Sequence, residues 1–335
     1  MGMPIVARLC LLVLVVWAAA TVNFFIPRIA TGRDPIREQM GQLAASGGLR
    51  QEGIEELVRA YQEKFGLDKP LLVQYLNFLR DTFSLNLGYS LASYPQTVSQ
   101  LIGNALPWTI GLLLVTTLIA FSSGTFLGAL VAWPATPRWV KLLAMPFLTL
   151  SAIPYYLLGL LLLYLFAFRV PIFPLSGGAE PGAVPSLTLS FIGQVLSHSI
   201  LPAFSIVLSA AGMWALGMRG MMVSVIGEDY IVQAEANGLR PKTVFLRYAM
   251  RNALLPQCTA LGLSLAYVVT GQVAVEVLFD YPGIGNLLFR AVSSSDYTLM
   301  NGIVFLTILS IGTMTLLLDL VYPLLDPRTS HRAGA

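Results

Sequence analysis

The sequence predicts an all-α membrane protein with six transmembrane helices. Its 335 residues are 56% hydrophobic and only 11% charged, whereas soluble domains usually carry about 25% charged residues. Six apolar runs reach roughly the 20 residues that a spanning helix needs. Each run must be helical, because hydrocarbon offers the backbone no hydrogen-bond partner. The runs cover residues 5–27, 107–133, 142–168, 200–222, 257–279 and 300–324.

The first run also resembles a cleaved signal peptide, with Arg8, an apolar stretch and three alanines at 18–20. Its apolar character continues to Ile26, which favours a retained helix. We therefore divide the chain into transmembrane helix 1 (1–27), an external segment (28–106), a membrane core (107–325) and a tail (326–335).

The external segment is predicted to be helical, because its apolar residues follow a period of 3.6. We expect two helices, whose apolar faces pack on each other or on the membrane helices; a role in handling solute is the alternative. The residues are Ile54, Leu57, Val58, Tyr61 and Phe65 in the first helix and Leu72, Tyr75, Leu76 and Leu79 in the second.

Basic residues in the short loops predict the orientation, since such loops are enriched in Lys and Arg on the cytoplasmic side. The 133–141 loop, the 223–256 segment and the tail are basic, whereas the 169–199 and 280–299 loops hold one arginine each. Both termini and the 223–256 segment are therefore predicted to be cytoplasmic.

The sequence carries no pattern of a catalytic, cofactor or metal site. It lacks a nucleotide-binding phosphate loop, metal-ligand spacing and a paired-carboxylate motif. Its two cysteines show no disulfide framework. Its net charge of +3 is too small to indicate a nucleic-acid partner. We therefore predict a non-catalytic membrane protein that binds no cofactor or metal.

Two acidic residues, Glu276 and Asp319, lie in the apolar runs and are candidate intramembrane polar sites. The competing interpretation is that both pair or reach water near the ends of their helices. Gly124 and Gly128 form a small-xxx-small pair that predicts close helix packing, and Pro154 predicts a kink in the third helix.

The 223–256 segment interrupts the apolar runs with polar helix. We expect one helix over 228–237, a left-handed Gly238, and a second helix that starts at Pro241 and ends before Pro256. The basic residues of this second helix could contact lipid headgroups. Alternatively, the small residues Ala234, Ala236 and Gly238 could let another protein approach closely.

These residues resemble the cytoplasmic EAA loop of binding-protein-dependent ABC importer permeases. Of that family's Glu-Ala-Ala, three residues, then Gly, only Ala234 and Gly238 are kept, and Val232 and Gln233 replace the first two. The strings EDYIVQAEANGL and LRYAMRNALLP are similar to the dipeptide/oligopeptide branch. FGLDKPLLVQYLNFL (65–79), NLGYSL (86–91), VEVLFDYPGIGNLLFRAVSSSDY (275–297) and LLDLVYPLLDPR (317–328) agree in order. Arg33 and Asn86 depart from the family pattern.

The resemblance implies a type I ABC importer permease in the bacterial plasma membrane. Its implied partners are a second homologous permease, two cytoplasmic ATPases that use the ATP, and an extracytoplasmic solute-binding protein. Short peptides are the favoured solute, with oligosaccharides or nickel as alternatives, and an autonomous secondary transporter is the competing class. The implied ATPase-coupling residues are Asp229, Tyr230, Gln233, Ala234, Ala236, Gly238, Leu239, Arg247, Asn252 and Pro256.

Overall fold

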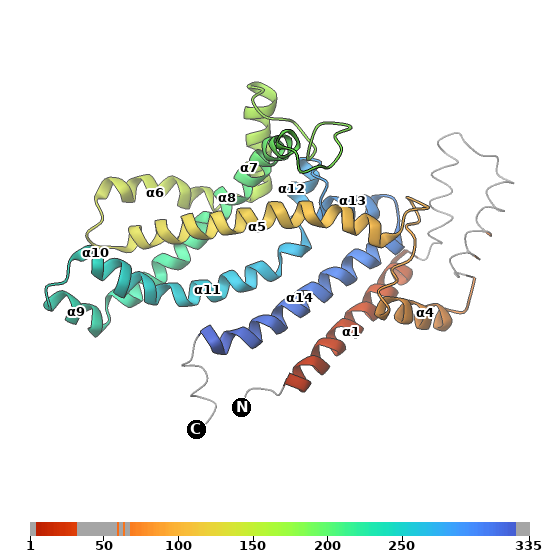
Figure 1. The fold of residues 1–335 in the computed structure, drawn as a ribbon, viewed down its shortest axis with the longest axis horizontal. Helices are drawn as coiled ribbons and strands as arrows, with labels where there is room; N and C mark the ends of the chain where they lie inside the picture. Colours follow the sequence, from red (N-terminus) through yellow and green to blue (C-terminus); the bar gives the residue numbers. More distant parts are fainter. Residues whose placement is uncertain (1–4, 32–58, 60–62, 64–67, 326–335) are drawn as a thin grey trace. The chain divides into compact units, whose positions relative to one another are not determined.

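A computed structural model describes residues 5–31, 59, 63 and 68–325, with side chains from Val6 to Phe25 and up to Leu317. Its elements in this part of the chain are helices, apart from one isolated bridge between Tyr89 and Thr97 (Figure 1). The first helix expected in the external segment, over residues 54–65, lies almost wholly outside the described residues. The chain divides into two compact units, which are described separately.

The first unit comprises Met1–Pro107 and Gly283–Leu317. It contains α1 (Ile5–Thr31), α4 (Leu71–Phe83), the start of α5 (Val98–Ala132), α13 (Ile284–Ser293) and most of α14 (Tyr297–Leu325). α1 packs on α14, where Asn23 Nδ2 donates to the Asn301 carbonyl at 3.3 Å. An apolar core joins α5, α13 and α14; its buried residues are Val98, Ile102, Ala105, Ile284, Ala291, Leu299 and Ile303.

The second unit comprises Trp108–Pro282 and Leu318–Ala335. The long helix α8 (Leu189–Ile226) contacts α6 (Arg138–Leu150), α7 (Tyr155–Leu163) and α11 (Arg251–Ala266). The remaining elements are shorter. They are η1 (Tyr164–Arg169), α9 (Asp229–Ala236), α10 (Pro241–Thr243), η2 (Val244–Met250), η3 (Val268–Thr270) and α12 (Val273–Leu278).

The spanning helices confirm the all-α membrane fold and correct several boundaries: the second span begins at Val98, and the fourth covers Leu189–Ile226. Five described helices are long and apolar enough to cross a membrane, or up to six if the α6–α7–η1 pair is one span. That pair bends by 98°, and Pro154 precedes the first residue of α7, as the predicted kink requires. The fifth span is Pro241–Thr270, so the expected run 257–279 is wrong. Left-handed Gly271 ends it and α12 follows separately.

The second unit depends on a close approach of α5 to α8. A methyl group added at Gly128 would overlap the backbone carbonyl of Ala215, and one at Gly124 would overlap that of Ala211. Both glycines and both alanines are buried. The predicted small-xxx-small contact is therefore present, with α8 as its partner.

Replacing Gly128 with leucine is expected to force α5 and α8 apart. Because the obstructing atoms are backbone, we expect a loss of about 1–3 kcal/mol in stability, measured as a lower thermal unfolding midpoint of the purified protein. Gly111→Leu is the matched control in α5, since a methyl group there meets nothing within 4 Å. Equal midpoints for the two variants would contradict the assigned contact.

Candidate functional site

The candidate site is the helical turn between α9 and α10. α9 ends with a two-bond Schellman cap, in which the Gly238 N–H donates to the Glu235 carbonyl at 2.9 Å and the Leu239 N–H donates to the Ala234 carbonyl at 3.3 Å. Gly238 has φ +74°, a conformation that other residues adopt at a cost. The predicted left-handed glycine is confirmed, and it sets the sharp turn between the two helices.

The second helix starts at Pro241, as predicted, with Arg240 as its N-cap. It does not end before Pro256, because the helical backbone continues through η2 and α11 to Ala266. Proline is tolerated in spanning helices where other groups satisfy the backbone. One turn before Pro256, the Asn252 side chain also bonds to the helix backbone: its Nδ2 donates to the Tyr248 carbonyl at 2.7 Å. The π-helical stretch η2 had no signal in the sequence that we recognised.

The inner face of α9 belongs to a buried core, which we call the loop core. It joins α9 to η2, α5 and α8, and Trp133 contacts the Phe245 ring at a centroid distance of 5.3 Å. Its buried residues are Ala129, Trp133, Met218, Met222, Ile231, Ala234, Val244, Phe245, Ala249 and Ala253. Ala234 is only 3% exposed. The expectation that it presents a small surface to another protein is therefore wrong, since its small size serves packing within the chain.

The outer face of α9 and the turn are exposed, and we call these residues the α9 face. It combines an apolar side chain, Val232, which is 59% exposed, with acidic and amide groups. Asp229 lies in the first turn of α9, where the helix dipole stabilises a negative charge. The exposed residues are Asp229, Val232, Gln233, Glu235, Ala236, Asn237, Gly238 and Leu239.

The other implied coupling residues lie around the α9 face without forming part of it. Tyr230 is half-buried against the loop core. Arg247 is exposed in η2, and Pro256 is exposed in α11. Asn252 is half-buried and bonded to backbone. The structure thus separates the exposed α9 face from residues that lie in the helix behind it.

Glu276 lies in α12 and is fully buried. Thr109 Oγ1 donates to its Oε1 at 3.0 Å. The neighbouring Tyr281 hydroxyl lies 3.0 Å from Ser199 Oγ, and burial raises the pKa of Tyr281, so this phenol stays neutral. The structure therefore favours the interpretation that Glu276 is hydrogen-bonded within the fold. Asp319 lies in α14, and its side chain is outside the described residues.

Asp296 was missed by the sequence reasoning, although an aspartate before an apolar run is an N-cap signal. It is fully buried and caps α14, where the Leu299 N–H donates to its Oδ1 at 3.0 Å. Its Oδ2 accepts from Ser90 Oγ and from the Ala92 N–H. The carboxylate therefore fastens the 86–97 loop to the start of α14.

Among the described residues, no group of three or more His, Cys, Asp or Glu side chains could hold a metal ion. The polar groups near the turn are helix caps and surface side chains.

Comparison with known proteins identifies the family. A family model described as "Binding-protein-dependent transport system inner membrane component" matches residues 124–331. A probable peptide ABC transporter permease of Sinorhizobium fredii is 31% identical, covering 99% of this chain and 100% of the relative. The oligopeptide permease AppB of Bacillus subtilis is 30% identical, covering 99% and 100%. The dipeptide permease DppB of the same organism is 29% identical over 94% of each chain.

The family consists of multi-pass inner-membrane components, which are non-catalytic subunits that depend on a binding protein and on separate ATPases. These properties agree with the predicted class and with the prediction that ATP is used by partner subunits. Because the matched region exceeds half of its length, the chain belongs to this family and is a permease subunit of a binding-protein-dependent ABC importer.

Proposed function

We propose that this chain forms one half of the membrane pore of a peptide importer, beside a second homologous permease, and that one of two ATPases docks on the α9 face. The observation that carries the docking assignment is the division of α9 into two sides. Ile231 and Ala234 are buried in the loop core, whereas Val232 and Ala236 are exposed. A helix of this kind can receive a partner on one side and transmit its movement on the other.

The loop core supports this mechanism through its packing. Protein interiors are close-packed and resist compression, so a displacement of α9 must move the residues that it contacts. α9 contacts η2, and its Ile231 and Ala234 share the loop core with Trp133 after α5, with Met218 and Met222 in α8 and with Phe245 in η2. A push from the ATPases would thus reach three spanning helices and drive the switch between inward-open and outward-open states.

Replacing exposed residues of the α9 face with aspartate is expected to weaken ATPase binding without unfolding the permease. For Val232→Asp and Ala236→Asp we expect a loss of about 2 kcal/mol, on the order of 30-fold in affinity, because an unpaired charge would be buried at the contact. The measurement is co-purification of the ATPase, with ATP-driven uptake and the thermal midpoint of the permease recorded in parallel.

Two controls separate docking from folding. Val184→Asp, at a position 77% exposed in another loop, should leave the complex intact. Ala234→Asp places a charge in the loop core and should lower the stability of the permease itself. If Val232→Asp and Ala236→Asp both retained full ATPase binding and uptake, the docking assignment would be wrong.

We further propose that both termini and the α9–α10 turn face the cytoplasm. Six crossings, with α6–α7–η1 counted as one, place the two ends of the chain on the same side. The 133–137 and 227–240 loops then also lie on that side. Arg138 directly follows the first loop and Arg240 ends the second, as expected of cytoplasmic loops.

Labelling tests this orientation in a Cys10→Ser, Cys258→Ser background. A membrane-impermeant maleimide added outside whole spheroplasts should modify Val184→Cys and spare Asn237→Cys; in inside-out vesicles stripped of ATPase the pattern should reverse. Both positions are exposed, so access to the reagent depends on the side of the membrane. The opposite pattern would reverse the assignment.

Short peptides are the proposed solute, supported by the peptide, dipeptide and oligopeptide permeases named among the relatives. Cells that lack this chain are expected to lose uptake of labelled di- to oligopeptides and to regain it with the wild-type gene. The Val232→Asp variant should restore less than one tenth of the uptake. Loss of oligosaccharide or nickel uptake, with peptide uptake intact, would contradict the peptide assignment.

A further inference from the structure

The helix α4 carries an apolar stripe that the rest of the described chain leaves uncovered. Leu72, Leu76 and Phe83 are 68%, 56% and 51% exposed. At about 100° per residue, the three side chains project within roughly 40° of one another. An exposed stripe of this kind on an amphipathic helix needs a partner of apolar chemistry.

The position of α4 along α1 indicates what that partner is. Tyr75 and Phe78 pack against Phe24 at ring-centroid distances of 5.4 and 5.2 Å, and the Tyr75 hydroxyl lies 2.8 Å from Thr21 Oγ1. Thr21 and Phe24 lie in the last two turns of the apolar run 5–27, which the charged Arg28 follows. α4 therefore sits at the depth where the hydrocarbon layer gives way to the headgroups.

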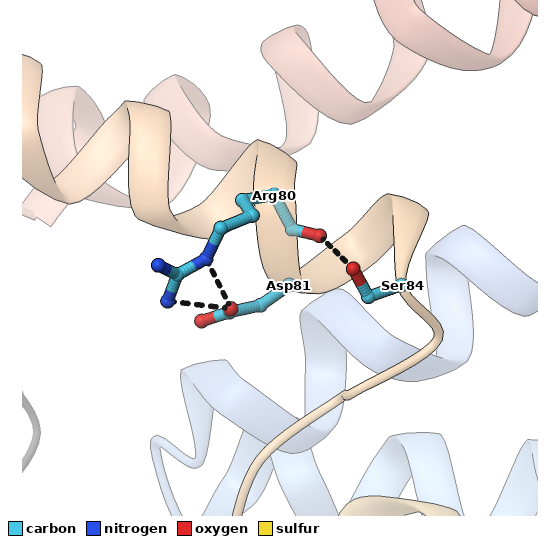
Figure 2. A network of polar contacts seen from close by, with 3 residues as sticks. All are labelled: Arg80, Asp81 and Ser84. Carbon is cyan, nitrogen blue, oxygen red and sulfur yellow. Dashed lines mark hydrogen bonds and ion pairs between the residues drawn. The ribbon is translucent and has the colours of Figure 1, made fainter.

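The polar side chains of α4 complete the arrangement. Arg80 Nε and Nη2 donate to Asp81 Oδ1 at 3.2 Å, and Ser84 Oγ donates to the Arg80 carbonyl at 2.8 Å (Figure 2). Asp81 and Asn77 project away from the apolar stripe, on the far side of the helix. The helix thus has three sectors: one against α1, one apolar and exposed, and one polar.

We propose that α4 is a membrane-surface helix whose apolar stripe enters the acyl-chain boundary of the leaflet at this end of α1. α1, on which α4 packs, also exposes apolar side chains, such as Val22, which face lipid in a spanning helix. In this arrangement α1 crosses the membrane and α4 lies beside it in the membrane plane. The apolar sector of α4 then faces the acyl chains, and its polar sector faces water. The bilayer then holds the segment that leads into the 86–97 loop.

The test uses the full-length permease in nanodiscs and in the cysteine-free background, with one spin label at a time. For each label we compare the collision rate with apolar oxygen to the collision rate with an aqueous nickel chelate. This ratio is expected to be at least twofold higher for labels at Leu72→Cys, Leu76→Cys and Phe83→Cys than for labels at Asn77→Cys and Asp81→Cys. A stripe as accessible to the chelate as Asp81 would place it in water and overturn the proposal. Protection from both reagents would place it against protein and overturn it equally.

A second measurement does not depend on labels. Leu72→Ser/Leu76→Ser should increase amide hydrogen exchange in α4 by about tenfold in nanodiscs and leave exchange in α14 unchanged, because the bilayer no longer holds the helix. Asn77→Ser/Asp81→Ser is the matched control on the polar sector and should leave exchange of α4 near wild type. Equal exchange for the two double variants would contradict the lipid contact.

Discussion

The close approach of α5 and α8 is the constraint on which the second unit depends. In hydrocarbon there is no water to drive apolar side chains together, so spanning helices associate through packing and short backbone distances. Gly124 and Gly128 allow this approach over Ala211 and Ala215. Gly212 repeats it toward α6, because a methyl group there would overlap Ser151. α8 is thereby held on two sides before the α9–α10 turn begins.

The same packing connects the α9 face to the spanning helices. α9 has only eight residues, and an isolated helix of that length is marginal in water. It is ordered by Ile231 and Ala234, which insert into the loop core formed on α5 and α8, and by the cap at Gly238. A surface whose stability comes from the spanning helices cannot move independently of them, and this is the property that a coupling element needs.

The sequence predicted the features that neighbouring residues determine and missed those that depend on contacts with distant parts of the chain. Gly238 and Pro241 were predicted correctly because a left-handed cap and a first-turn proline are local signals. The predicted end of the second helix at Pro256 was wrong, because the apolar span continues to Ala266 and outweighs the local preference of proline. The expected exposure of Ala234 was wrong for a similar reason. Alanine on a short helix suits a core as well as a surface, and the loop core that buries Ala234 is built from distant elements, which supply Trp133 and Met222.

The buried carboxylates show the same dependence on distant partners and bear on the transport mechanism. An ionisable residue in a membrane protein is a functional candidate by default, yet Glu276 accepts from Thr109 and Asp296 accepts from Ser90 and Ala92. Each unit therefore uses an acidic side chain to fasten a segment far away in the sequence. A carboxylate that accepts hydrogen bonds from hydroxyl and amide donors of its own fold suits a structural fastening. Because partner ATPases supply the energy, the structural role of these two acids favours coupling through the α9 face over a relay of protons through the acids.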